Sequence, residues 1–255
     1  MSKLVEGQVT NHVQVLRLSR PEKKNAINAE MYRALSDALE HGDASDDVRV
    51  HVIVGSEGTF SAGNDLTDFL KTDENRDDAM AEVLRFIHLL PHIRKPLLAA
   101  VDGLAVGIGT TLLFHCDLVF ASDRATFSTP FVDLGLVPEA GSSLLGPLQL
   151  GYARAFELLV LGKPFSSERM REAGLINAVV PPDELEQAAL AAAAGLAAKP
   201  PHALAISRRL LRGNPTTVQN RIREEAEHFA ERLKAPETVE ALTTFTQKRP
   251  PNFLK

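Results

Sequence analysis

One acidic residue stands in surroundings that could make it reactive. Glu139 follows an apolar stretch and Pro138, and it precedes the small residues 140–143. A carboxyl group among apolar side chains has a raised pKa and can act as a general base or acid. The same pattern also fits an ordinary glutamate at a helix N-terminus, where it complements the helix dipole. The pattern alone leaves both interpretations of Glu139 open.

Glycine-containing turns follow two apolar segments that are typical of buried strands. Residues 60–66 come after the first segment, 48–54, and residues 103–111 come after the second, 97–101. Ligands gather at the carboxyl ends of strands in open α/β sheets. Glycine lets the backbone turn sharply and bring its N–H groups close to a ligand. Two such turns could direct two N–H donors at one oxygen as an oxyanion hole, although simple strand-to-helix turns would give the same pattern.

Other kinds of chemistry lack their motifs. A dinucleotide-binding interpretation of Gly107-Ile108-Gly109 fails because the third glycine is replaced by Leu112. No Walker loop is present, and the serines and histidines form no recognisable triad order. His88 and His92 are four residues apart, but Pro91 lies between them and no third ligand is near. We therefore expect no metal site.

Composition narrows the class of protein further. The chain has 255 residues and a formal net charge of -5, which fits one or two domains and gives no sign of a basic nucleic-acid-binding face. A single cysteine excludes an intrachain disulfide framework. The N-terminus lacks the apolar stretch of a signal peptide, and Asp102 and three glycines interrupt the longest apolar region. We expect a cytoplasmic protein that binds neither nucleic acid nor membrane.

The elements that must position these residues alternate between strands and helices. Residues 9–19 alternate in polarity and predict one strand, and Asn28 is placed to cap a helix with apolar residues every fourth position. The runs 48–54, 97–101 and 118–121 are typical of buried parallel strands. This alternation predicts an α/β fold with mostly parallel pairing.

Further loops and helices are predicted along the rest of the chain. The charged segment 72–78 is expected to be a surface loop, and a helix is expected over 79–90. Asp183 and Glu186 form a plausible capping pair for an alanine-rich helix. A last helix is expected to begin at Pro236.

Several of these segments together resemble the crotonase superfamily, also called the enoyl-CoA hydratase/isomerase family. The resemblance covers nearly the whole chain, and the order and spacing of the segments match throughout. The segments that carry it are residues 20–28, 60–66, 102–111, 116–117 and 173–176. Three further stretches, 63–69, 121–127 and 138–143, are similar to Δ3,Δ2-enoyl-CoA isomerases of the peroxisomal type. Those proteins often carry an extra acyl-CoA-binding domain or a peroxisomal signal, and we expect neither here.

The resemblance implies a fold and an assembly. The fold is the α/β crotonase (ClpP-like) fold, made of repeated ββα units with a helical C-terminal trimerisation region. We expect the core to span residues 1–190 and the oligomerising helices of the same domain to span 191–255. The family assembles as trimers or paired trimers, and the sequence does not distinguish a homotrimer from a hexamer.

The resemblance also assigns roles around the two turns. The oxyanion donors would be the backbone N–H groups of Asn64 and Ile108. The two glutamates that hydratases of this family use to activate water are replaced by Thr111 and Phe131. Neither side chain can act as a carboxylate base at neutral pH. Glu139 is then the single carboxylate at a catalytic position of the family.

Coenzyme A contacts are implied in the same way. Lys23 or Lys24 would meet the phosphate charges, and backbone groups of nearby residues would meet the adenine and pantetheine. Asp65 is expected chiefly to brace its loop, and Asp133 to be structural, with a second acid there left open. The full predicted set is Lys23, Lys24, Ala26, Ala62, Gly63, Asn64, Asp65, Leu66 and Lys248.

The sequence therefore predicts a Δ3,Δ2-enoyl-CoA isomerase that shifts the double bond of a 3-enoyl-CoA to give the trans-2-enoyl-CoA. One base suffices for this 1,3 proton shift, and no cofactor is expected because coenzyme A is part of the substrate. The alternatives are an enoyl-CoA hydratase, another acyl-CoA reaction that uses the same enolate, or a non-catalytic acyl-CoA-binding module.

Overall fold

The computed structural model describes residues 2–65, 74–247 and 249–253. Its centre is a six-stranded sheet in the order β1-β2-β3-β4-β6-β9, in which only the β1–β2 pair is antiparallel. The strands are β1 (Val5–Thr10), β2 (Val13–Leu18), β3 (Val50–Val54), β4 (Leu97–Val101), β6 (Leu118–Ser122) and β9 (Ala178–Val180). The predicted α/β class with mostly parallel pairing is confirmed.

The N-terminal strand prediction was wrong in one respect. Residues 9–19 do not form one strand, because the chain reverses at Asn11 and His12 and forms a hairpin with Val5–Thr10 paired to Val13–Leu18. Both turn residues have positive φ, 50° and 65°. Asparagine tolerates this left-handed conformation better than most residues, and that signal marks the hairpin turn.

A smaller sheet lies beside the large one. It contains β5 (Leu104–Val106), β7 (Thr126–Ser128) and β8 (Phe165–Ser166), in the order β5-β7-β8. Residues 103–111, which include β5, were predicted as one turn, and neither β7 nor β8 was predicted. Strands of two or three residues are too short to show the alternation on which a strand prediction depends.

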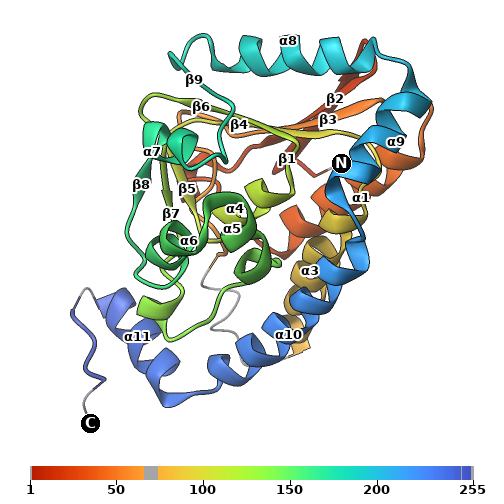
Figure 1. Cartoon of the computed structure of the whole chain (residues 1–255). Helices are drawn as coiled ribbons and strands as arrows, with labels where there is room; N and C mark the ends of the chain where they lie inside the picture. Colours follow the sequence, from red (N-terminus) through yellow and green to blue (C-terminus); the bar gives the residue numbers. More distant parts are fainter. Residues whose placement is uncertain (1, 66–73, 248, 254–255) are drawn as a thin grey trace.

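Helices cover both faces of the large sheet (Figure 1). On one face, α8 (Leu185–Ala197) packs its alanines, including Ala189 and Ala193, against the valines of β3. The predicted cap of α8 was wrong: the N-cap is Glu184, and no side chain caps the helix. The expected boundary at residue 190 falls inside α8, and alanines on both sides of this boundary pack against the sheet.

The opposite face carries α1 (Ala29–Ala44) and α3 (Glu74–Leu89). Asn28 caps α1 as predicted, with its side chain accepting a hydrogen bond from the amide of Met31. The predicted loop over 72–78 was wrong from Glu74 onward, because α3 begins there. Charge alone does not prevent a helix, since glutamate and arginine are good helix formers.

The remaining helices lead from the sheet to the C-terminal region. Here α10 contacts α3 and α5, and α11 contacts the 3-10 turn Val132–Leu134. None of the helices in the described ranges has the length and apolarity needed to cross a bilayer. Besides α1, α3 and α8, the helices are α4 (Ile108–Thr111), α5 (Ser142–Leu150), α6 (Tyr152–Leu159), α7 (Ser167–Glu172), α9 (Pro201–Arg212), α10 (Pro215–Leu233) and α11 (Pro236–Gln247).

Candidate active site

The two glycine turns predicted from sequence lie against each other. Ser61, in the turn after β3, donates its amide to the carbonyl of Leu104 at 2.9 Å, and the Val106 amide returns a bond to Ser61. Gly63 has a φ of +88°, and a Cβ at this position would lie 2.7 Å from the carbonyl oxygen of Val106. Glycine is therefore required for the turns to approach this closely.

The two predicted oxyanion donors, Asn64 and Ile108, lie on these two turns. Asn64 forms a parallel bridge with Ile27, in which the neighbouring Gly63 carbonyl and Asp65 amide make the hydrogen bonds. In such a bridge the N–H of Asn64 itself points away from Ile27. Ile108 is the first residue of α4, where a helix leaves its N–H groups without an internal partner. Both N–H groups therefore lie outside the hydrogen bonds of the bridge and of the helix, and their role as a pair of donors stays a prediction.

Glu139 lies next to the turn that contains Asn64. Its carboxyl group is 6% exposed and accepts a hydrogen bond from Thr111 Oγ1 at 3.1 Å. Burial raises the pKa of Glu139 to about 7, and the nearby Glu225 carboxylate adds to the rise. Hydrogen bonds from Thr111 and from the Asn64 side chain lower the pKa, but they do not offset the burial. Glu139 is thus a carboxyl group that can exchange a proton near neutral pH.

The side chain of Asn64 has a role that the sequence analysis did not predict. Tyr32, buried on α1 and packed against Phe86, donates its hydroxyl hydrogen to Asn64 Oδ1. With Oδ1 occupied in this way, the amide nitrogen of Asn64 is the group that faces Glu139. Tyr32 therefore fixes the orientation of an amide that stabilises the charged form of Glu139.

The backbone directly after Glu139 is unusual. Ala140 and Gly141 both adopt the left-handed conformation, with φ of 56° and 72°. His115 bonds the Ala140 carbonyl through Nε2 at 2.6 Å. Burial lowers the pKa of His115 to about 4, so this ring is neutral and Nε2–H is the donor. The hydrogen bond from His115 to the Ala140 carbonyl therefore holds the turn that follows Glu139.

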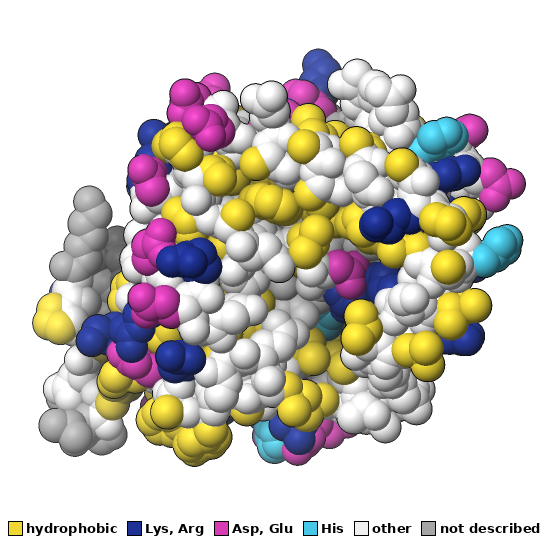
Figure 2. Space-filling view, turned by 45° about the horizontal axis from the view of Figure 1, so that its top comes forward, with side chains coloured by type: hydrophobic (Ala, Val, Ile, Leu, Met, Phe, Trp, Pro, Cys, Tyr) yellow, Lys and Arg dark blue, Asp and Glu magenta, His cyan; other side chains and the backbone are white. Residues whose placement is uncertain are grey.

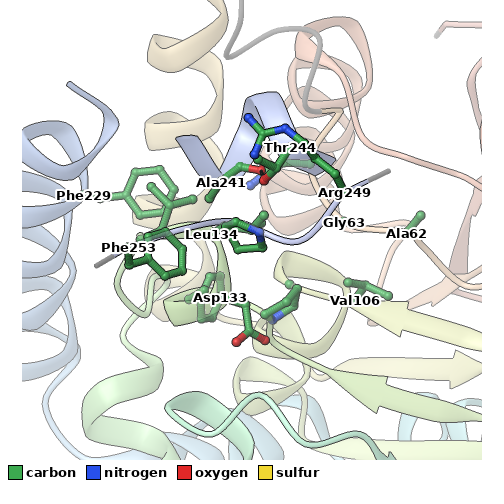
Figure 3. Close-up of a pocket in the computed structure, with 16 residues that line it drawn as sticks. Ala62, Gly63, Val106, Asp133, Leu134, Phe229, Ala241, Thr244, Arg249 and Phe253 are labelled. Atoms are coloured by element: carbon green, nitrogen blue, oxygen red, sulfur yellow. Dashed lines mark hydrogen bonds between the residues drawn. The ribbon is translucent and has the colours of Figure 1, made fainter. Parts of the chain in front are cut away.

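A cavity of about 480 Å³ opens beside the turns (Figure 3). Ala62, Gly63 and Val106 lie at one end, and Phe229 and Phe253 lie at the other. Ile108 and Glu139 do not line this cavity. Asn64 connects Glu139 to the cavity, because Asn64 lines the cavity and its side chain forms a hydrogen bond with the Glu139 carboxyl group. The wall residues are mostly apolar: Ala62, Gly63, Val106, Gly107, Pro130, Phe131, Leu134, Leu136, Phe229, Ala241, Pro251 and Phe253.

The residues predicted to contact coenzyme A gather around the first turn. Lys23 and Lys24 are exposed, and the Lys24 carbonyl accepts the Ala62 amide at 2.9 Å. The Ala26 carbonyl accepts a bond from Arg20, which also pairs with Asp65 at 2.7 Å. Asp65 therefore braces the loop in this structure. Two members of the predicted set, Leu66 and Lys248, lie outside the described residues.

Three residues that line or support the site carried no prediction. Arg249 lines the cavity and pairs with Glu240 at 2.9 Å, but it belongs to no motif. Glu225 was detectable, because it interrupts an apolar stripe of α10. Tyr32 had no sequence signal, since only the fold brings α1 to the turn.

The described residues contain no group of three His, Cys, Asp or Glu side chains placed to hold a metal, so His88 and His92 are not part of such a group.

Comparison with known proteins agrees with this architecture. The family model for enoyl-CoA hydratase/isomerase matches residues 8–255. A crystal structure of an enoyl-CoA hydratase/isomerase from Pseudoalteromonas atlantica superposes with a TM-score of 0.93 at 39% identity, covering 98% of this chain and 100% of the other. The chain belongs to the enoyl-CoA hydratase/isomerase family, and its fold is the crotonase fold that the sequence predicted.

Curated relatives differ in the reactions that their names describe. Enoyl-CoA delta isomerase 2 of Rattus norvegicus is 36% identical over 250 residues, which cover 96% of this chain but 63% of the longer rat protein. The chain therefore spans less than two thirds of that relative. The 2,3-dehydroadipyl-CoA hydratase of Escherichia coli K12 is 30% identical over 99% of both chains. Family membership alone does not choose between isomerisation and hydration.

Proposed function

We propose that this protein is a Δ3,Δ2-enoyl-CoA isomerase in which Glu139 transfers one proton between C2 and C4 of the substrate. The observation that carries the proposal is the buried carboxyl group of Glu139, which contacts Thr111 and Asn64 of the two turns and has a pKa of about 7. A base that returns its proton works best when its pKa lies near the pH of the reaction. Similarity to the rat isomerase supports the same reaction.

The reaction proceeds in two proton transfers. The thioester oxygen of a 3-enoyl-CoA accepts hydrogen bonds from the N–H groups of Asn64 and Ile108. The Glu139 carboxylate removes a proton from C2, and the electron pair of that C–H bond enters a dienolate whose charge rests on the thioester oxygen. Protonated Glu139 then delivers the proton to C4, which gives the trans-2-enoyl-CoA. Each oxyanion donor contributes on the order of 10²–10³ in rate.

Hydration is the second candidate, and the site disfavours it. Addition of water to a double bond in this family uses two glutamates, and Thr111 and Phe131 occupy those positions here. Thr111 is engaged with Glu139 at 3.1 Å, and Phe131 is 5% exposed and lines the cavity. Neither can activate a water molecule. The proposed isomerisation needs neither a second carboxylate nor a cofactor.

The rest of the substrate can be placed from charge and polarity. Lys23 and Lys24 stand exposed beside the first turn, where they would meet the phosphates of coenzyme A. The acyl chain would extend toward the opposite end of the cavity, between Phe229 and Phe253 (Figure 3). Arg249 also lines the cavity, where it pairs with Glu240.

We also propose a homo-oligomer, a trimer or a pair of trimers. Large apolar side chains stand exposed on α9, where Leu211 is 89% exposed, and on α6, where Tyr152 is 73% exposed. Apolar groups at the surface are visible on the right of Figure 2, the side on which α9 lies. Exposed patches of this kind mark protein–protein contacts. Sedimentation velocity would test the assembly, and a monomer at micromolar concentration would contradict it.

The decisive experiment is to incubate 3-enoyl-CoA with the wild type and with Glu139→Gln, following formation of the conjugated thioester by its ultraviolet absorption. We expect the substitution to lower kcat by about 10²–10⁴, the usual contribution of a positioned general base. Glu172→Gln, which changes an exposed glutamate at the end of α7, is the matched control. Full activity of Glu139→Gln would show that Glu139 is not the base. Rapid hydration of crotonyl-CoA by the wild type would favour hydration as the function.

A further inference from the structure

The C-terminal helix α10 carries a buried carboxylate. Glu225 is 6% exposed and lies in line with Ile222 and Phe229, which are also buried. Residues at these spacings share one face of a helix. A charged residue in such an apolar face is costly unless partners satisfy it.

Three hydrogen bonds satisfy Glu225, and all three come from the turn after Glu139. One carboxylate oxygen accepts from the Gly141 amide at 2.6 Å. The other accepts from the amide of Ser143 at 2.9 Å and from its hydroxyl at 2.5 Å. Burial raises the pKa of Glu225, and the donors of Ser143 and Gly141 act against this rise because they favour the ionised form.

The turn depends on α10 in its shape as well. At Gly141 a Cβ would lie 2.9 Å from a methyl group of Val218, so helix and turn are in direct contact. Ser142 donates its amide to the carbonyl of Glu139 at 3.0 Å, which connects the base to the same turn. A shift of Glu225 would therefore move the backbone that aims Glu139.

We propose that Glu225 is a positioning residue for the Glu139 proton transfer: it anchors the 140–143 turn and places a fixed negative charge behind the base. This inference rests on the proposed function. It gives α10 a part in the chemistry of its own chain, beyond the oligomer contacts expected of the C-terminal helices.

The charges around the pair support this arrangement. Glu225 raises the pKa of Glu139, and this effect adds to that of burial and opposes the hydrogen bonds from Thr111 and Asn64. Arg221, one turn earlier on α10, faces Glu225 and bonds Ser143 Oγ at 3.3 Å. On the other side of the turn, His115 is neutral. Removing the charge of Glu225 should therefore lower the pKa of Glu139.

The test titrates Glu139 directly, without the need for turnover. Carbon-13 NMR of the protein labelled at glutamate carboxyl carbons follows Glu139, which is assigned as the resonance lost in Glu139→Gln. In Glu225→Gln we expect the Glu139 midpoint to move to lower pH, because a like charge has gone. We also expect kcat for 3-enoyl-CoA to fall roughly 10-fold, since small displacements of a catalytic group cost about that much or more.

Matched variants separate charge from shape. Glu227→Gln removes an exposed charge on the same helix and should leave both the Glu139 midpoint and kcat unchanged. Ser143→Ala keeps the Glu225 charge but removes one hydrogen bond, so kcat should fall while the midpoint stays. Glu225→Asp should restore the midpoint but not the full kcat.

Specific outcomes would overturn the proposal. One is a folded Glu225→Gln protein, verified by circular dichroism, with an unchanged Glu139 midpoint and unchanged kcat. If Glu225→Gln does not fold, unchanged kcat in both Ser143→Ala and Glu225→Asp overturns it. If the enzyme converts no 3-enoyl-CoA at all, the proposed function fails, whereas the NMR midpoints still decide whether Glu225 acts on Glu139.

Discussion

Two carboxyl groups at opposite ends of the central sheet, one buried and one partly buried, have opposite properties. Glu139 lies beyond the carboxyl ends of the parallel strands, whereas Asp43 lies at the end of α1 next to His51, near the start of β3. Burial raises the pKa of Glu139 to about 7. Burial also acts to raise the pKa of Asp43, but nearby His51, whose Nε2 is 3.9 Å away, and hydrogen bonds from Arg94 and Lys95 outweigh it and hold that pKa far below its usual range.

The difference lies in the balance of donors. Asp43 accepts from the amides of Arg94 and Lys95 and from the Arg94 guanidinium, at 2.9 to 3.0 Å. Glu139 receives neutral side-chain donors and has a second carboxylate nearby. A carboxylate with charged and backbone donors is fixed in its ionised form, while one with few donors exchanges its proton. Burial alone therefore does not identify a catalytic acid.

The largest expected effect of this contrast is on stability. The pKa of Glu139 is about 7 in the folded protein against an ordinary value of 4.5, so ionisation of this group opposes folding as pH rises through that window. Glu139→Gln should be more stable than the wild type by up to about 3 kcal/mol above pH 7, and the gain should vanish below pH 4.5. Urea unfolding across pH measures it. A difference that does not change with pH would contradict the assigned shift.

Asp43→Asn should have the opposite effect. The lowered pKa of Asp43 means that its ionised form stabilises the fold above pH 3.8, and this contribution is lost only as pH falls through the lower folded-state pKa. We expect the substitution to cost roughly 2 kcal/mol at pH 7, because one donor of Arg94 loses its acceptor. Thermal unfolding checks the loss, and kcat should stay unchanged. A fall in kcat at full stability would mean that the two ends of the sheet are coupled.

The smallest effect concerns the orientation of Asn64. Tyr32→Phe removes the donor to Asn64 Oδ1, so the amide can turn and present its oxygen to Glu139. We expect the acid limb of the kcat/KM profile to move to higher pH and kcat to fall by up to about 10-fold, since a hydrogen bond between neutral groups contributes ~0.5–1.5 kcal/mol. Tyr152→Phe, at an exposed tyrosine, is the control. An unchanged profile would show that Asn64 keeps its orientation without Tyr32.

The sequence predicted local features well and distant contacts poorly. The buried runs that form β3, β4 and β6 and the cap at Asn28 were correct because each pattern lies within a few residues. The short strands β5, β7 and β8 and the turn at Asn11 were missed, because two or three residues carry too little pattern.

The same distinction holds for the site. The turns around Gly63 and Gly107 and the isolated Glu139 could be recognised in the sequence, and the structure brings them together. Glu225 could be noticed as a charge in an apolar stripe, but the approach of Tyr32 and Glu225 to Glu139 could not be predicted, because they lie 107 and 86 positions away in the chain. Contacts over such separations depend on the packing of whole helices and not on any local motif.

The position of the cavity wall has an evolutionary consequence. The proton-transfer groups are on turns of the sheet, which cannot change without disturbing the core. Ala241 and Phe253 belong to α11 and the segment after it, whereas Phe229 is on α10 together with Glu225. Mutations in α11 and in the segment after it can reshape the cavity while leaving Glu139 and both turns intact. Descendants of this chain could thus acquire new acyl substrates by drift in one terminal segment, with the reaction itself inherited unchanged.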